Sequence, residues 1–145
     1  MINPNFNPHS STRSLVVERD LPHPPEKIWR ALTEASLMGQ WLLETDFLPF
    51  VGHKFTLRNK PMPHWNGVIE GEVLVVEPPQ RLSYSWEALG LKSVVSWTLT
   101  PTASGTHVRM EQSGFKSEED ANYKGATYGW QKFIGSLERV VGEMV

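Results

Sequence analysis

The chain has 145 residues and a mass of 16.5 kDa, which fits one domain with a single core. Its net charge of -2 excludes the strongly basic surface that collects phosphates, so we expect no nucleic-acid partner. The absence of cysteine excludes disulfides, thiolate nucleophiles and Cys-ligated metal centres. The apolar runs are short, as in residues 73–76, and the N-terminus lacks the pattern of an export signal. We therefore expect a cytoplasmic protein without a membrane span.

The first third of the chain predicts an arm, a strand and a helical pair. Residues 1–12 are rich in Asn, Pro and Ser, and we interpret them as a flexible arm that precedes a single domain over residues 13–145. β-Prone residues predict a first strand over 13–19, which a cluster of prolines ends. Apolar residues then recur at helical spacing over 28–41, which predicts a helical hairpin or a bent helix.

The middle of the chain changes to a period of two, with Gly, Pro and Asn-Gly turns between the alternating segments. Connections this short favour antiparallel neighbours, so we expect a meander. The strands are predicted over residues 45–48, 54–58, 68–76, 81–87, 92–100 and 106–113.

The C-terminal segment predicts one long helix. Ser117 is a suitable N-cap, and the acidic residues 118–120 suit the positive end of a helix dipole. Apolar residues between Ala126 and Met144 fall on one side, so this helix should lie across the sheet.

Several short motifs, in this order along the chain, resemble a known family. They are Pro25-Glu26-Lys27-Ile28-Trp29-Arg30-Ala31-Leu32-Thr33, Gln40-Trp41-Leu42, Glu77-Pro78-Pro79-Gln80-Arg81-Leu82, Tyr84-Ser85-Trp86, Trp97-Thr98-Leu99-Thr100-Pro101, Gly105-Thr106 and Gly129-Trp130. The chain resembles the SRPBCC (START-like) superfamily and, more narrowly, the homologues of the heat-shock protein 90 ATPase activator. The resemblance implies an α+β helix-grip fold. In that fold a curved antiparallel sheet of six to seven strands wraps around a long C-terminal helix, with two short helices after strand one.

The resemblance also implies a cavity between the sheet and the long helix, in which members of the superfamily hold lipids, steroids, phenolics or polyketides. Strand alternation places a set of aromatic, apolar and amide side chains on the inner face, opposite the apolar side of the helix. The alternation also places Val75 on that face. We predict these as ligand-binding: Ile69, Val73, Tyr84, Trp86, Trp97, Met110, Gln112, Trp130, Phe133 and Ile134. For each of them a place in a filled core is the alternative.

Two sequence features favour a partly empty interior. Hydroxyl, amide and indole groups stand among the apolar walls, a mixture typical of small-molecule pockets. Gly125 and Gly129 interrupt the long helix, and each costs about 1 kcal/mol of helix stability relative to Ala. Their missing side chains leave room for a ligand, allow close packing of helix on sheet, or belong to an irregular helix start.

Candidate catalytic residues are few, and we predict none. Glu70 and Glu72 share one strand face, but alternation turns that face to solvent. The histidines lack metal-ligand spacing, so we expect no metal and no cofactor. His64, beside Trp65 in a proline-rich loop, would be the best proton-transfer candidate if that loop covered the cavity mouth. Gln112 stands where relatives often have His.

The sequence therefore favours a small-molecule binding protein, with a hydrophobic ligand as partner. A role as a chaperone partner is the first alternative. The preceding domain of eukaryotic activators has no counterpart in the dozen residues before the first strand, which argues against ATPase stimulation. A cyclase or dehydratase-like enzyme is the second alternative. We expect a monomer or a weak homodimer.

Overall fold

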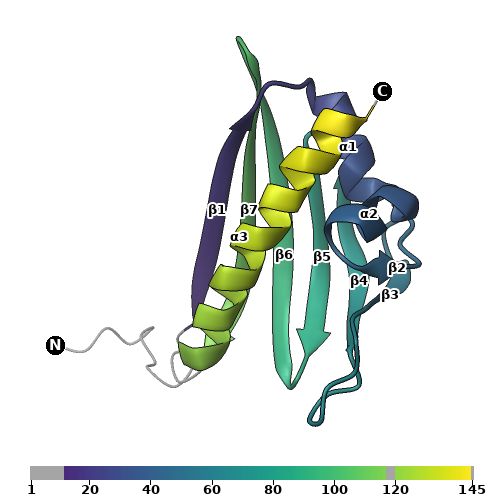
Figure 1. The fold of residues 1–145 in the computed structure, drawn as a ribbon, viewed down its shortest axis with the longest axis vertical. Helices are drawn as coiled ribbons and strands as arrows, with labels where there is room; N and C mark the ends of the chain where they lie inside the picture. Colours follow the sequence, from purple (N-terminus) through teal and green to yellow (C-terminus); the bar gives the residue numbers. More distant parts are fainter. Residues whose placement is uncertain (1–11, 117–119, 145) are drawn as a thin grey trace, which may run out of the picture.

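A computed structural model describes residues 12–116 and 120–144 of the chain (Figure 1). The elements in chain order are β1 (Thr12–Leu21), α1 (Pro25–Thr33), α2 (Ala35–Trp41), β2 (Glu44–Thr45), β3 (Lys54–Arg58), β4 (Val68–Glu77), β5 (Arg81–Ala88), β6 (Leu91–Thr102), β7 (Gly105–Lys116) and α3 (Asp120–Glu143). The predicted arm, apart from Thr12, and the predicted N-cap Ser117 lie outside the described residues. The boundary between arm and domain stays a prediction.

The strands form one antiparallel sheet in the order β1-β7-β6-β5-β4-β3-β2. From β2 to β7 each strand lies beside the next in sequence, so the predicted meander is confirmed. β1 pairs with β7, which brings the first and last strands together. α3 crosses one face of the sheet diagonally, and its C-terminal end meets α1 and α2 (Figure 1). This is the helix-grip arrangement that the sequence predicted.

The predicted helical hairpin is a pair of short helices separated by one extended residue. Glu34 has φ -91° and ψ 120°, so it ends α1 and precedes α2. Pro25 occupies the first turn of α1, where its missing N–H leaves no hydrogen bond unmade. Trp41, at the end of α2, donates its indole N–H to the carbonyl oxygen of Ala31 at 2.7 Å and thereby holds the two helices together.

One assignment of the inner face was wrong. Simple alternation along β4 places Val75 on the inner face with Val73, but the register shifts between these two residues. Val73 pairs with Tyr84, whereas Val75 pairs with Ser83 and Val76 packs against the core. A β-bulge adds one residue to a strand, so the alternation inverts beyond it.

The core between α3 and the sheet is densely filled along most of its length. Leu137 and Val141 of α3 are fully buried, as are Met38 of α2 and Val95 of β6. No helix among residues 12–116 and 120–144 is both long enough and apolar enough to cross a membrane.

Candidate ligand-binding cavity

A cavity of about 300 Å³ lies between the first turns of α3 and the inner face of the sheet. The start of α3 and the β5–β6 hairpin lie at the same end of the sheet (Figure 1). The cavity is lined by Trp65, Ile69, Trp86, Ala88, Leu89, Leu91, Gln112, Gly125, Ala126, Gly129, Trp130 and Phe133. Its volume is at the lower end of the range of small-molecule pockets.

The structure divides the predicted ligand-binding residues into two groups. Ile69, Trp86, Gln112, Trp130 and Phe133 line the cavity. The others belong to the packed core and are not part of the lining: Val73, Tyr84, Trp97, Met110 and Ile134. Contact of either group with a ligand stays a prediction.

Trp130 stands between the filled and the hollow part of the interior. Its ring centre lies 5.9 Å from that of Trp97, which belongs to the packed core. The same ring lies 5.3 Å from Trp86 and 5.6 Å from Phe133, which line the cavity. One indole therefore closes off the inner end of the hollow.

The polar groups of the packed part bond to one another. The hydroxyl oxygen of Tyr84 accepts a hydrogen bond of 3.1 Å from the indole N–H of Trp97. Burial raises the pKa of Tyr84 far above its ordinary value of 10 because it disfavours the phenolate. Tyr84 is therefore a neutral internal acceptor that lies outside the cavity lining.

A second chain of hydrogen bonds runs along the cavity wall. The indole of Trp130 donates to Oε1 of Gln112 at 2.7 Å, and Nε2 of Gln112 donates to the hydroxyl of Ser93 at 2.9 Å. Ser93 donates in turn to the carbonyl oxygen of Trp86 at 2.9 Å. Because an indole N–H can only donate, this chain fixes the orientation of the Gln112 amide.

Two of the four glycines of α3, Gly125 and Gly129, face the cavity. A Cβ atom built on Gly125 or Gly129 would meet no atom within 4 Å, and both residues line the cavity. Close packing of helix on sheet therefore does not explain them. Their missing side chains recess this wall of the cavity.

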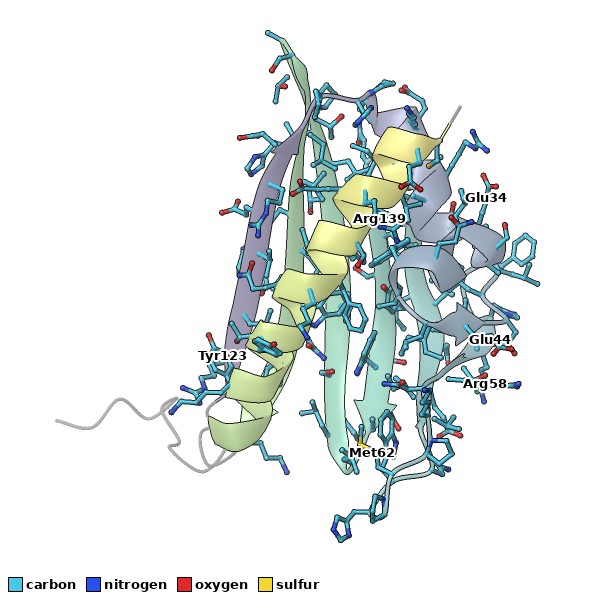
Figure 2. The ribbon with its side chains drawn as sticks, viewed as in Figure 1. Glu34, Glu44, Arg58, Met62, Tyr123 and Arg139 are labelled. Carbon is cyan, nitrogen blue, oxygen red and sulfur yellow. The ribbon has the colours of Figure 1, made fainter. Side chains whose placement is uncertain are left out.

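The mouth of the cavity is built by residues that the sequence did not single out as ligand-binding. Trp65, in the β3–β4 loop, donates its indole N–H to the carbonyl oxygen of Val68 at 3.0 Å, which holds its ring at the lining. Met62 of the same loop is exposed and lies at this end of the sheet (Figure 2). His64, between them, is exposed and does not line the cavity.

The β5–β6 hairpin forms the opposite side of the mouth. Leu89 and Gly90 both have positive φ, 54° and 79°, as a two-residue hairpin turn of the primed type requires. Asn or Gly is usual at the first of these positions, because the left-handed region costs other residues about 1–2 kcal/mol. Leu89 is 62% exposed there and contributes an apolar side chain to the mouth. Gly90 between two alternating segments is the sequence signal for a turn at this point.

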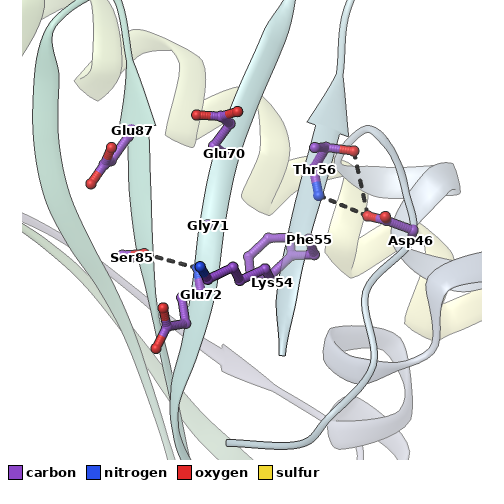
Figure 3. A pocket seen from close by; sticks show the side chains of 9 residues that line it. All are labelled: Asp46, Lys54, Phe55, Thr56, Glu70, Gly71, Glu72, Ser85 and Glu87. Carbon is purple, nitrogen blue, oxygen red and sulfur yellow. Dashed lines mark hydrogen bonds between the residues drawn. The ribbon is translucent and has the colours of Figure 1, made fainter. Parts of the chain in front are cut away.

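The opposite face of the sheet carries a separate, charged groove of about 440 Å³ (Figure 3). Glu70, Glu72 and Glu87 line it together with Lys54, so the predicted carboxylate pair lies outside the cavity. Asp46 at its edge accepts a hydrogen bond from the backbone N–H of Thr56 at 2.7 Å, and this bond is the main reason that its pKa is lowered. Among the described residues no three His, Asp or Glu side chains are placed to hold a metal ion.

Several solved structures are similar to this chain. Protein MLL2253 from Mesorhizobium loti is 47% identical with a TM-score of 0.86, and the match covers 92% of this chain and 99% of that one. Protein BH1534 from Bacillus halodurans is 25% identical with a TM-score of 0.76, over 89% of this chain and 96% of that one. DynU16, from the dynemicin biosynthetic locus, is 24% identical with a TM-score of 0.77, over 90% of this chain and 47% of that one. At that identity it shows a common fold alone.

None of the curated proteins matches the chain. The family model of the activator of Hsp90 ATPase homolog 1-like proteins matches residues 22–142. That match runs from the end of β1 almost to the end of α3, so it includes the cavity and both short helices. The chain therefore belongs to the activator of Hsp90 ATPase homolog 1-like family, as its motifs indicated.

Proposed function

We propose that this protein binds one small, mainly apolar molecule in the cavity beneath the first turns of α3. The observation that carries the proposal is the recessed wall at Gly125 and Gly129, where the helix gives up stability and the space in front of it is empty. A filled core would gain from a larger side chain at the half-buried Gly129.

The composition of the lining supports the same function. Trp65, Trp86, Trp130 and Phe133 provide wide apolar walls, and Gln112 provides a single amide. Apolar walls with a few placed polar groups are typical of sites that bury most of a small ligand. The volume of about 300 Å³ favours a compact ring compound or a short chain over a whole sterol.

The test fills the cavity from the helix side. The probe is N-phenylnaphthylamine, a neutral dye whose fluorescence rises in apolar sites. We expect saturable one-to-one binding to the wild-type chain and its loss in Gly129→Leu, because the new side chain occupies the probe's space. At a hundred times its dissociation constant, the bound probe adds about 2.7 kcal/mol to stability, which a thermal melt detects.

Gly135→Leu is the matched control. Gly135 lies in the same helix, is exposed and has no atom within 4 Å of a built Cβ, so this change gives the same gain in helix propensity outside the cavity. It should bind the dye as the wild type does. If Gly129→Leu also binds the dye with unchanged affinity, the cavity is not the site.

A chaperone-directed role is the second candidate, because the matching family model is described by activation of the Hsp90 ATPase. The ATPase rate of the chaperone from the same organism, measured with and without a molar excess of this protein, tests it. An unchanged rate rejects that role.

A further inference from the structure

The described lining of the cavity contains no ionisable side chain. The polar side-chain groups of the lining are one amide, on Gln112, and the indoles of Trp65, Trp86 and Trp130. An ionised carboxylate moved into such surroundings loses its hydration without gaining a cation, which costs far more than burial of a neutral group.

The groove next to the cavity carries no net positive charge. An adjoining groove shares Trp65, Ala88, Leu89 and Leu91 with the cavity, and its charged residues are Glu70, Glu87 and Lys92. Two carboxylates against one ammonium give this groove no excess of positive charge, and Glu70 and Glu87 also line the groove on the opposite face of the sheet. A ligand with an acidic head therefore gains no net attraction from this groove and meets no cation in the cavity lining.

The hydrogen-bond donors of the three lining indoles differ in one respect. The N–H of Trp65 is bonded to Val68, and that of Trp130 to Gln112. The N–H of Trp86 makes no hydrogen bond to any residue that the structure describes, although its backbone carbonyl accepts one from Ser93.

This free N–H reaches open space. Among the described residues no buried side-chain nitrogen or oxygen lacks a partner, so the indole nitrogen of Trp86 is not enclosed in packed atoms. Trp86 is only 9% exposed and lines the cavity, so the cavity is the space that its donor can reach. A ligand without an acceptor would leave this donor unpaired, at a cost of about 1–3 kcal/mol where water is excluded.

From these observations we infer that the occupant of the cavity is a neutral molecule with a flat apolar body and one hydrogen-bond acceptor, such as a carbonyl oxygen, that pairs with the indole N–H of Trp86. The inference rests on the proposed function and makes it narrower. It selects neutral aromatic ketones, quinones, esters or ethers, and it excludes free fatty acids and other anions.

Three probes of similar shape test the inference: acetylnaphthalene, ethylnaphthalene and naphthoate. Acetylnaphthalene has a neutral hydrogen-bond acceptor, ethylnaphthalene has none, and naphthoate has a charged one. The affinity of each probe for the wild-type chain is measured by competition with N-phenylnaphthylamine at neutral pH. We expect acetylnaphthalene to bind about three- to tenfold more tightly than ethylnaphthalene, the value of one neutral hydrogen bond. Naphthoate should bind most weakly.

Trp86→Phe removes the donor and keeps an aromatic wall. In this variant acetylnaphthalene should lose its three- to tenfold advantage over ethylnaphthalene. Trp65→Phe is the control, because it removes an indole whose donor is already used by Val68. It should leave the ratio of the two affinities unchanged.

The outcomes separate the two proposals. Equal affinity of the wild-type chain for acetylnaphthalene and ethylnaphthalene, or an unchanged ratio in Trp86→Phe, overturns the role of Trp86, and tighter binding of naphthoate overturns neutrality. In each of these cases the dye still binds, so the proposed function survives. If neither the dye nor any naphthalene binds, the proposed function itself fails. The ratio of the two affinities is measured on the wild-type chain alone. It therefore tests the inference even if the Trp86→Phe variant does not fold.

Discussion

Buried polar side chains in this protein bond to one another in short chains, and these chains decide which groups stay available to a ligand. Trp97 donates to Tyr84, and Trp130 donates to Gln112. Each pair lets an indole enter the interior with its N–H bonded to an acceptor. Trp86 differs from both, because its indole N–H makes no hydrogen bond to a residue that the structure describes.

At the residue scale, Tyr84→Phe tests the cost of breaking one such pair. The change removes the acceptor of the Trp97 N–H inside a packed region, so we expect a loss of about 1–3 kcal/mol in the free energy of unfolding. Tyr128→Phe is the control, since Tyr128 is 65% exposed and should change stability by less than about 0.5 kcal/mol. Urea unfolding curves measure both. Equal effects would mean that the buried hydroxyl contributes no net stability.

At the scale of elements, the pairing of β1 with β7 joins the first strand of the chain to the last. His107 of β7 lies between two carboxylates of β1. Its Nε2 is 3.0 Å from Oε1 of Glu18, and its Nδ1 is 2.8 Å from Oδ1 of Asp20. Arg109 adds a weaker ion pair to Glu18 at 3.9 Å.

Only the protonated imidazole can donate from both ring nitrogens. The hydrogen bond to Glu18 and then that to Asp20 therefore raise the pKa of His107 above its ordinary 6.5. A raised pKa means that the folded chain binds this proton more tightly than the unfolded chain. The resulting stability is fully present below pH 6.5 and is lost as the pH rises through the raised value.

We therefore expect His107→Gln to destabilise the protein most at about pH 5.5 and least at about pH 9. Denaturant unfolding of wild type and variant across this range measures the difference. His64→Gln is the control, because it removes an exposed imidazole that makes no ion pair with a described residue. Its free energy of unfolding should differ little from that of the wild type. If the difference in free energy of unfolding between wild type and His107→Gln does not vary with pH, the ion pairs of His107 with Glu18 and Asp20 do not stabilise the pairing of β1 with β7.

At the scale of the whole molecule, the interior has a packed part and a hollow part along the same helix. Toward the C-terminal end of α3, Leu137 and Val141 are fully buried against the sheet and the short helices. Toward its N-terminal end, Gly125 and Gly129 face the cavity. The packed core and the cavity thus lie at opposite ends of one helix.

This division predicts unequal costs for truncation along α3. Leu137→Ala should lower the free energy of unfolding by about 2–5 kcal/mol, because it opens a void in a packed core. Phe133→Ala should cost less, about 1–2 kcal/mol despite its larger side chain, because Phe133 is half-buried and already borders a hollow. Chemical unfolding of both variants measures the order. A larger loss of stability for Phe133→Ala than for Leu137→Ala would contradict the placement of the packed core toward the C-terminal end of α3.

Local patterns in the sequence were sufficient for the architecture. The period of two from residue 54 onward, the short turns and the apolar side of the last helix predicted the meander and the helix across it, because each of these signals depends on neighbours in the chain. The same alternation brought Ile69, Trp86 and Gln112 to the cavity wall. It failed at Val75, because a bulge depends on the partner strand.

Tertiary structure alone decided where the interior is full and where it is empty. Tyr84 and Trp86 lie on the same strand face, yet one is enclosed by the rings of Phe47 and Phe55 and the other borders the cavity. Trp65 and Leu89 reach the mouth only because two turns distant in sequence meet at one end of the sheet. Whether a part of the interior is filled depends on the total volume of the side chains that several elements place there. Periodicity along one element carries no information about that total volume.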